Sequence, residues 1–197
     1  MTPRRAGGMN NVRVLVAACV LIYGILAFFM GALPGITMSK TAPGPAVQPL
    51  SLAAQRGRGA YVGEGCAYCH TQQVRPLAQD HVWGRPSVAG DYAYATPELL
   101  GFERTGPDLT NIGARQPSAV WQEIHLYDPR SLVAGSIMPA YRWLFVLKNH
   151  AEPGDVVVAV PPAYAPVGRV VVARPEALDL VAYLASLKQA PLPKATP

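Results

Sequence analysis

Apolar residues are unevenly distributed along the chain, and their longest run lies near the amino terminus. Positions 14–33 are twenty consecutive residues without a charged side chain. At a helical rise of about 1.5 Å per residue this run spans roughly 30 Å, enough to cross the hydrocarbon core of a bilayer. A cleaved signal peptide has a shorter apolar part, about 7–15 residues, that ends at a small-residue cleavage site. This run is longer and ends at Pro34-Gly35, so we expect a permanent membrane-spanning helix.

The rest of the chain shows helical periodicity in three places. Segments 52–65, 117–127 and 175–188 carry apolar side chains at the spacing of one helix face. Two β-branched runs, 156–160 and 170–173, are separated by prolines and a glycine, and they predict a small hairpin. The expected fold class is therefore mainly α, with one amino-terminal transmembrane helix and a small β-hairpin.

These elements divide the chain into five parts. We expect an amino-terminal segment at 1–13, the anchor at 14–33, a Pro/Gly-rich linker at 34–51, one folded domain at 52–190 and a tail at 191–197. A semi-extended linker of this kind separates a folded domain from the membrane surface.

The charge distribution gives the anchor an orientation. The chain has 17 Lys and Arg against 12 Asp and Glu, a net charge of +5, but Arg4, Arg5 and Arg13 all precede the apolar run. The remainder is close to neutral and has no basic stripe, which argues against nucleic-acid binding. Because basic residues favour the cytoplasmic side, we expect 1–13 in the cytoplasm and the folded domain outside, in a bacterial periplasm.

The chemistry of the chain centres on Cys66-Ala67-Tyr68-Cys69-His70. C-x-x-C-H is the attachment signature of c-type haem, in which two cysteines bind the haem vinyl groups and the histidine becomes the proximal iron ligand. A thioredoxin-like motif would need a βαβ context, and a zinc site would need a second pair of ligands at suitable spacing. A disulfide between Cys66 and Cys69 would leave His70 unexplained. The motif predicts one covalently bound haem c.

A low-spin electron-transfer haem usually needs a sixth ligand, and a methionine thioether in this position raises the reduction potential. Met138 is the one methionine after the motif, in a loop bounded by glycine and proline. We expect His70 and Met138 to be the axial ligands. The rivals are His81 and His150, which lie in polar loops, and His125, which lies on a predicted helix.

Six segments resemble a known family, the mono-haem cytochrome c subunit (subunit II) of cbb3-type cytochrome c oxidases. The resemblance covers about residues 10–150 and the final helix. It rests on an ordered set of matches: Gly65-Cys66-Ala67-Tyr68-Cys69-His70, Val74-Arg75-Pro76, Ser87-Val88-Ala89-Gly90-Asp91, Arg104-Thr105-Gly106-Pro107-Asp108-Leu109, His125-Leu126-Tyr127-Asp128-Pro129-Arg130 and Ser136-Ile137-Met138-Pro139-Ala140-Tyr141.

The resemblance implies a function. Family members receive electrons from a di-haem cytochrome c subunit or a soluble cytochrome c. They pass these electrons to haem b of a catalytic haem-copper subunit that reduces dioxygen to water and pumps protons. This chain would then be a non-catalytic electron-transfer subunit in the bacterial inner membrane. The family match also makes Arg75 a candidate contact for a haem propionate or the catalytic subunit. Glu103 departs from the family, which usually carries a basic residue there.

The resemblance implies structural details of a class I cytochrome c domain as well. In such domains a proline carbonyl accepts the proton on the far nitrogen of the proximal histidine, a role that falls here to Pro107. The first and last helices cross, and Gly59, Tyr61, Val181 and Leu184 are the candidate contacts.

Two other functions use the same chemistry. The small subunit of bacterial nitric-oxide reductase is also one anchor plus one mono-haem domain, and a tethered cytochrome c could shuttle electrons without a fixed partner. The long segment 71–104 fits the oxidase better than the reductase. Within it, Trp83, Tyr92, Tyr94 and Leu99 suggest an insertion that docks onto a permanent partner.

Overall fold

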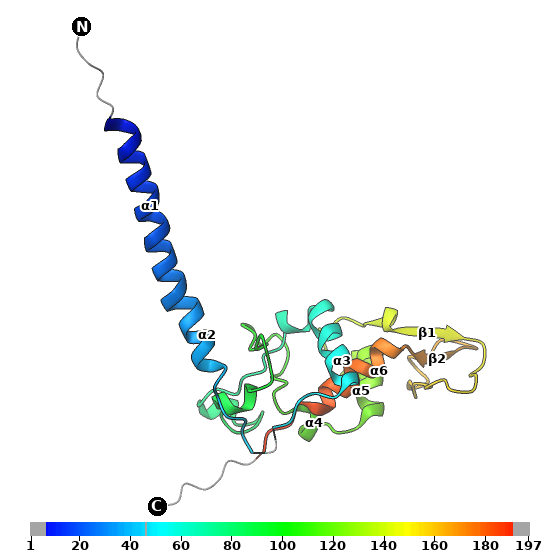
Figure 1. Ribbon diagram of the computed structural model, residues 1–197. Helices are drawn as coiled ribbons and strands as arrows, with labels where there is room; N and C mark the ends of the chain where they lie inside the picture. Colours follow the sequence, from blue (N-terminus) through cyan, green and yellow to red (C-terminus); the bar gives the residue numbers. More distant parts are fainter. Residues whose placement is uncertain (1–6, 46, 191–197) are drawn as a thin grey trace, which may run out of the picture. The chain divides into compact units, whose positions relative to one another are not determined.

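The computed structural model describes residues 7–45 and 47–190, which form two compact units divided between residues 42 and 43 (Figure 1). Residues 1–6 of the expected amino-terminal segment 1–13, with Arg4 and Arg5, and the expected tail 191–197 lie outside the described residues. Each unit is described below by itself.

The first unit is one long helix. It consists of α1 (Gly7–Ala27), a π-helical turn η1 (Phe28–Ala32) and α2 (Leu33–Met38). The part from Asn11–Met38 has a mean hydropathy of 2.6 over its most apolar stretch, none of which is buried, and is long enough to span a bilayer. The anchor predicted from the apolar run is therefore present as a candidate membrane helix.

The helix does not end at Pro34-Gly35, so the expectation of a linker starting at residue 34 was wrong by about five residues. Pro34 lies in the first turn of α2, directly after the π-helical turn. Proline lacks a backbone N–H and disrupts the regular α-helical ladder, whereas a local π-turn shifts that ladder and re-satisfies the backbone. The extended part of the linker begins after Met38.

The second unit is mainly helical. Its helices are α3 (Leu52–Gly63), α4 (Ile112–Arg115), α5 (Ala119–Tyr127) and α6 (Pro175–Ser186), joined by loops that contain short 3-10 turns. The hydroxyl oxygens of Ser51 and Ser118 accept backbone N–H groups at the starts of α3 and α5, both at 3.2 Å. These serines are N-caps, so the expected helices at 52–65 and 117–127 start within two residues of the prediction.

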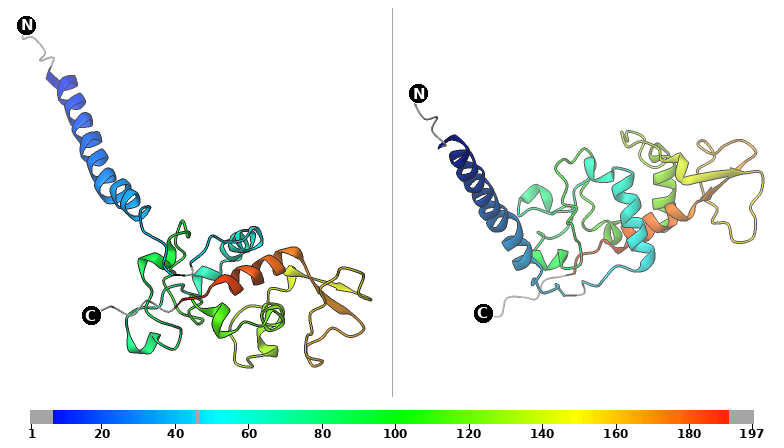
Figure 2. Two further views of the ribbon diagram at one scale, coloured as in Figure 1. Left: turned by 60° about the horizontal axis from the view of Figure 1, so that its bottom comes forward. Right: turned by 45° about the horizontal axis from the view of Figure 1, so that its top comes forward.

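Helices α3 and α6 lie side by side and cross (Figures 1 and 2). The crossing is close because Gly57 faces the backbone of Asp179, and any Cβ at position 57 would overlap the carbonyl group there. Arg56 adds an ion pair to Asp179 at 2.6 Å, and the rings of Tyr61 and Tyr183 pack edge to face at 5.4 Å. The expected crossing is thus present.

The prediction that Gly59 lies at this contact was wrong. A Cβ on Gly59 would meet nothing within 4 Å, because this position faces away from α6, two residues and roughly 200° round the helix from Gly57. Gly57 lies four residues before Tyr61, on the helix face that contacts Tyr183, so the spacing along α3 favours Gly57 over Gly59.

The small sheet has two antiparallel strands, β1 (Phe145–Lys148) and β2 (Val170–Ala173), with Phe145 opposite Ala173. The strand at 170–173 was expected, but its partner was not. Residues 156–160 do not form a strand, although Val157 makes an isolated bridge to Val172. They run along the other edge of β2, where Val158 N–H donates to the carbonyl oxygen of Val171 at 2.9 Å.

The long segment 71–104 is held together by buried charge rather than by regular helices. Asp80 is 1% exposed and accepts hydrogen bonds from Arg75 at 2.9 Å and from Arg104 at 2.6 Å. Of the four aromatic and apolar residues expected on a docking surface, Tyr94 is exposed. The other three are partly buried within their own domain: the guanidinium of Arg115 covers Trp83, Tyr92 donates to the Gln72 carbonyl, and Leu99 packs on the core.

Candidate functional site

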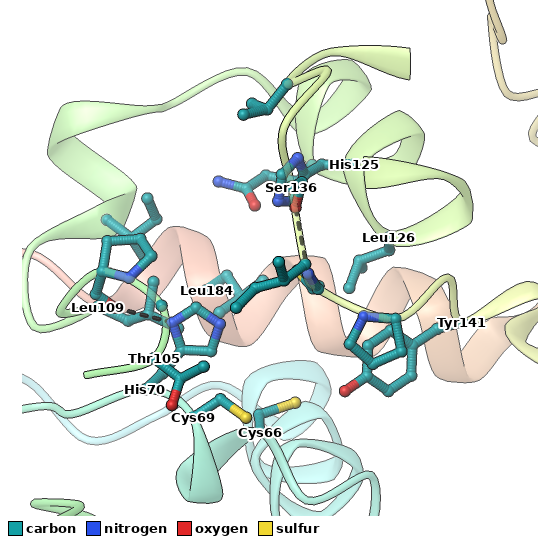
Figure 3. Close-up of a pocket in the computed structure, with 18 of the residues that line it drawn as sticks. Cys66, Cys69, His70, Thr105, Leu109, His125, Leu126, Ser136, Tyr141 and Leu184 are labelled. Carbon is teal, nitrogen blue, oxygen red and sulfur yellow. Dashed lines mark hydrogen bonds between the residues drawn. The ribbon is translucent and has the colours of Figure 1, made fainter. Parts of the chain in front are cut away.

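The C-x-x-C-H residues form a tight turn at the end of α3. Gly65 has φ +74°, a left-handed conformation that suits glycine, and it is followed by the 3-10 turn at Cys66–Tyr68. The His70 N–H then donates to the Cys66 carbonyl at 3.0 Å. This turn brings Cys66, Cys69 and His70 to the wall of one cavity (Figure 3).

The two cysteines differ in exposure, and they are not joined by a disulfide: Cys66 is buried and Cys69 is exposed. Burial raises the pKa of the Cys66 thiol to about 11, so it is protonated at neutral pH. A cysteine of a redox-active C-x-x-C pair instead has a lowered pKa. The buried Cys66 thiol therefore lacks the lowered pKa of a reactive cysteine.

The loop 104–109 fixes the orientation of the His70 ring. The Nδ1 atom of His70 lies 2.7 Å from the carbonyl oxygen of Pro107, and Gly106 packs so closely on the ring that a Cβ would overlap it. Because a carbonyl can only accept, Nδ1 must carry the proton, which leaves Nε2 free to bind a metal. Burial lowers the pKa of His70, and this favours the neutral imidazole that a metal requires.

Asp108 holds this loop in place. It is fully buried, and its carboxylate accepts hydrogen bonds from the Thr71 hydroxyl at 2.5 Å, the Gln73 N–H at 2.9 Å and the Thr110 N–H at 2.8 Å. A buried carboxylate with three donors rigidly joins the segment after His70 to the loop containing Pro107.

Met138 lines the same cavity as His70, although its loop comes much later in the chain. Its N–H donates to the hydroxyl oxygen of Ser136 at 3.3 Å. Arg130 reaches into the loop and donates to the carbonyl oxygens of Ser136 and Met138, at 3.3 and 3.1 Å. The guanidinium therefore constrains the backbone on both sides of Ile137.

Sequence reasoning missed the residues that build this loop. Asp128 is buried, caps the turn at Pro129–Ser131 through the Arg130 N–H, and pairs with Arg142 at 2.7 Å. An aspartate directly before Pro-x-Ser is a recognisable cap signal. The pattern could thus have identified Asp128, but not the contact from Arg130 to the methionine loop, which depends on the fold.

Of the three rival histidines, His125 lines the cavity, whereas His81 and His150 are exposed loop residues outside it. The His125 ring is stacked on Trp121, with centroids 4.5 Å apart and 12° between the planes. Burial, with a smaller contribution from His70, lowers the pKa of His125 to about 4. Its Nδ1 atom is buried and has no hydrogen-bond partner among the described residues.

Arg75 does not line the cavity. Its guanidinium binds Asp80 through two hydrogen bonds, at 2.9 and 3.0 Å, and its side chain is 49% exposed. Its contact in this chain is therefore structural, and a role toward a haem propionate or a second subunit stays a prediction. Glu103 is exposed, next to the well-anchored Arg104.

The cavity fits a largely apolar cofactor that supplies most of its own metal ligands. Its volume is about 380 Å³, and its walls are mainly apolar. Nowhere in the described residues do three His, Cys, Asp or Glu side chains gather as they would around a bare metal ion. The cavity walls carry the imidazoles of His70 and His125 and one thioether, and two such ligands suffice for an iron that already has four porphyrin nitrogens. The unpartnered Nδ1 of His125 leaves a polar contact to be filled.

A match to a family of known proteins extends over most of the chain. A search of curated proteins found no match. Residues 8–159 match the family model described as cytochrome c oxidase, mono-heme subunit/FixO. The matched region contains the anchor, the C-x-x-C-H turn, Pro107 and Met138, and it stops before β2 and α6. A mono-haem subunit carries one haem, and an oxidase subunit is associated with a membrane and with a catalytic subunit. With the match covering most of its length, the chain belongs to the mono-haem subunit (FixO) family of cbb3-type cytochrome c oxidases.

Proposed function

We propose that this chain binds one haem c covalently through Cys66 and Cys69, with His70 and Met138 as axial ligands. The observation that supports this best is the convergence of these four side chains, from positions 66–70 and 138, on one apolar cavity. The bound haem would supply a one-electron couple, ferric to ferrous iron, without transfer of atoms.

The residues of the chain have separate tasks in this function. The Pro107 carbonyl holds the proton on Nδ1 of His70, which strengthens donation from Nε2. Arg130 and Ser136 hold the Met138 loop, so the thioether position changes little between the two redox states. Apolar walls exclude water, which keeps solvent reorganisation small and favours a raised potential.

We also propose a place in the respiratory complex. The chain receives one electron at a time from a di-haem cytochrome c subunit or a soluble cytochrome c, and passes each to haem b of the catalytic haem-copper subunit. Four such electrons and four protons convert one dioxygen into two waters there. The anchor would fix the haem domain on the periplasmic side of the inner membrane, consistent with Arg13 at the other end of the apolar run.

The test is to purify the full-length chain gently from membranes through a carboxyl-terminal tag and to analyse what copurifies. We expect copper, haem b and oxygen consumption together with haem c. Non-haem iron without copper would instead indicate a nitric-oxide reductase. Haem c with this chain alone would indicate a tethered shuttle and contradict the proposal.

A further inference from the structure

Two sets of polar side chains lie at separate ends of the cavity. Cys66 and Cys69 lie at one end, and His125 and Ser136 lie at the other (Figure 3). A haem has its vinyl groups along one edge and its two propionates along the opposite edge. If the cysteines bind the vinyl groups, then the propionates are directed away from the cysteine end.

A haem propionate is an anion, and a buried anion needs hydrogen-bond donors or a cation. Neither arginine nor lysine is among the described residues that line the cavity. Aspartate and glutamate are absent from this set as well, so no like charge opposes a carboxylate there. Neutral donors must therefore stabilise the propionate within the cavity.

His125 has the properties of such a donor. Its Nδ1 atom is buried and unpartnered within the described part of the chain, and stacking on Trp121 limits rotation of the ring. A buried polar atom without a partner is unusual, and it leaves a hydrogen bond that a bound group can make.

Ser136 can add a second donor. Its oxygen accepts from the Met138 N–H at 3.3 Å, while its hydroxyl proton has no acceptor within the described residues. Gln122 also lines the cavity, and its amide uses one of its two N–H groups to donate to the Gln116 carbonyl at 3.1 Å.

We propose that His125, together with Ser136, forms the binding site for a haem propionate, with the imidazole N–H donating to a carboxylate oxygen. This inference rests on the proposed function, because it requires a haem attached at Cys66 and Cys69. It gives a second task to the methionine loop, which would then contact both the iron and the propionate edge.

The experiment compares the full-length wild type with His125→Leu, His125→Gln and the control His81→Leu, which changes an exposed histidine outside the cavity. Mass spectrometry under denaturing conditions first establishes covalent haem in each protein. Resonance Raman spectroscopy then measures the propionate bending mode, whose frequency rises with hydrogen bonding. We expect a downward shift in His125→Leu, a smaller shift in His125→Gln, whose amide can still donate, and none in His81→Leu.

Two results would overturn the inference. The first is an unchanged bending mode in His125→Leu with haem attached. The second is a bis-histidine electron paramagnetic resonance signal in the wild type that His125→Leu removes, because His125 would then be an iron ligand. If His125→Leu does not bind haem, the propionate bending mode is measured in His125→Gln and Ser136→Ala instead. Unchanged bending modes in both variants would overturn the inference. A wild type without covalent haem would instead refute the proposed function.

Discussion

Met138 illustrates how one side chain can be constrained by its backbone. The serine and arginine contacts hold the loop, while the thioether itself lies half-buried at the cavity wall. If it is the sixth ligand, Met138→Ala keeps the haem attached but lowers the midpoint potential on the order of 100 mV, because axial ligands set potentials over roughly 0.8 V. Redox titration monitored by absorbance measures this.

The matched control is Met30→Ala, a methionine within the membrane helix and outside the cavity. It should leave the potential unchanged. An unaltered potential and ferric spectrum in Met138→Ala would remove Met138 as ligand.

Asp80 makes the stability of the segment 71–104 dependent on pH. Hydrogen bonds from Arg75, then from Arg104, hold the pKa of Asp80 well below its usual value. In the unfolded chain this carboxyl titrates near pH 3.9. Its charge therefore stabilises the fold fully above about pH 4, and the stabilisation is lost as the pH falls toward the folded pKa.

We accordingly expect Asp80→Asn to lower the Tm at pH 7, and the difference from wild type to shrink as the pH is lowered below about 4. Thermal unfolding followed by circular dichroism checks this. Glu103→Gln, at an exposed position, serves as the control and should not change the Tm. A constant Tm difference at every pH would contradict the role of the Asp80 charge.

At the scale of elements, the crossing of α3 and α6 depends on the absence of a single side chain. Gly57→Ala places a Cβ against the Asp179 backbone and should destabilise the domain by about 1–3 kcal/mol, the usual cost of overpacking. Gly59→Ala faces open space and should stabilise it by up to about 1 kcal/mol, because alanine is the better helix former. Chemical denaturation of both variants measures the difference, and equal effects would refute the assignment.

At the scale of the whole molecule, the two units of the chain suit different surroundings: lipid for the apolar helix and water for the folded domain. Residues 43–190 contain a complete core with the cavity, whereas Asn11–Met38 exposes its apolar side chains. Replacing residues 1–42 by a cleavable export signal should therefore release a water-soluble haem domain into the periplasm, with an unchanged absorption spectrum. Cell fractionation and mass spectrometry test this.

The same domain without the export signal should lack covalent haem, since attachment takes place on the outer face of the bacterial membrane. Recovery of the exported domain in the membrane fraction would show that more than the helix holds it there. Covalent haem on the cytoplasmic form would contradict the proposed orientation.

The features predictable from the sequence depend on residues close together in the chain. The apolar run predicts the anchor because a helix advances a fixed distance per residue, whatever surrounds it. Ser51 and Ser118 mark helix starts by capping a backbone N–H three residues later. The C-x-x-C-H motif likewise needs one turn of backbone, which is why it predicts a cofactor chemistry without knowledge of the fold.

Tertiary structure alone decided the contacts between distant residues. It paired β2 with residues 145–148, brought Arg104 to Asp80 and placed His125 in the cavity. In each case several partners satisfy the local pattern equally well, and the choice depends on how the whole domain packs. The sequence by itself thus determined the local elements and the predicted cofactor chemistry, whereas packing determined which side chains surround the cavity.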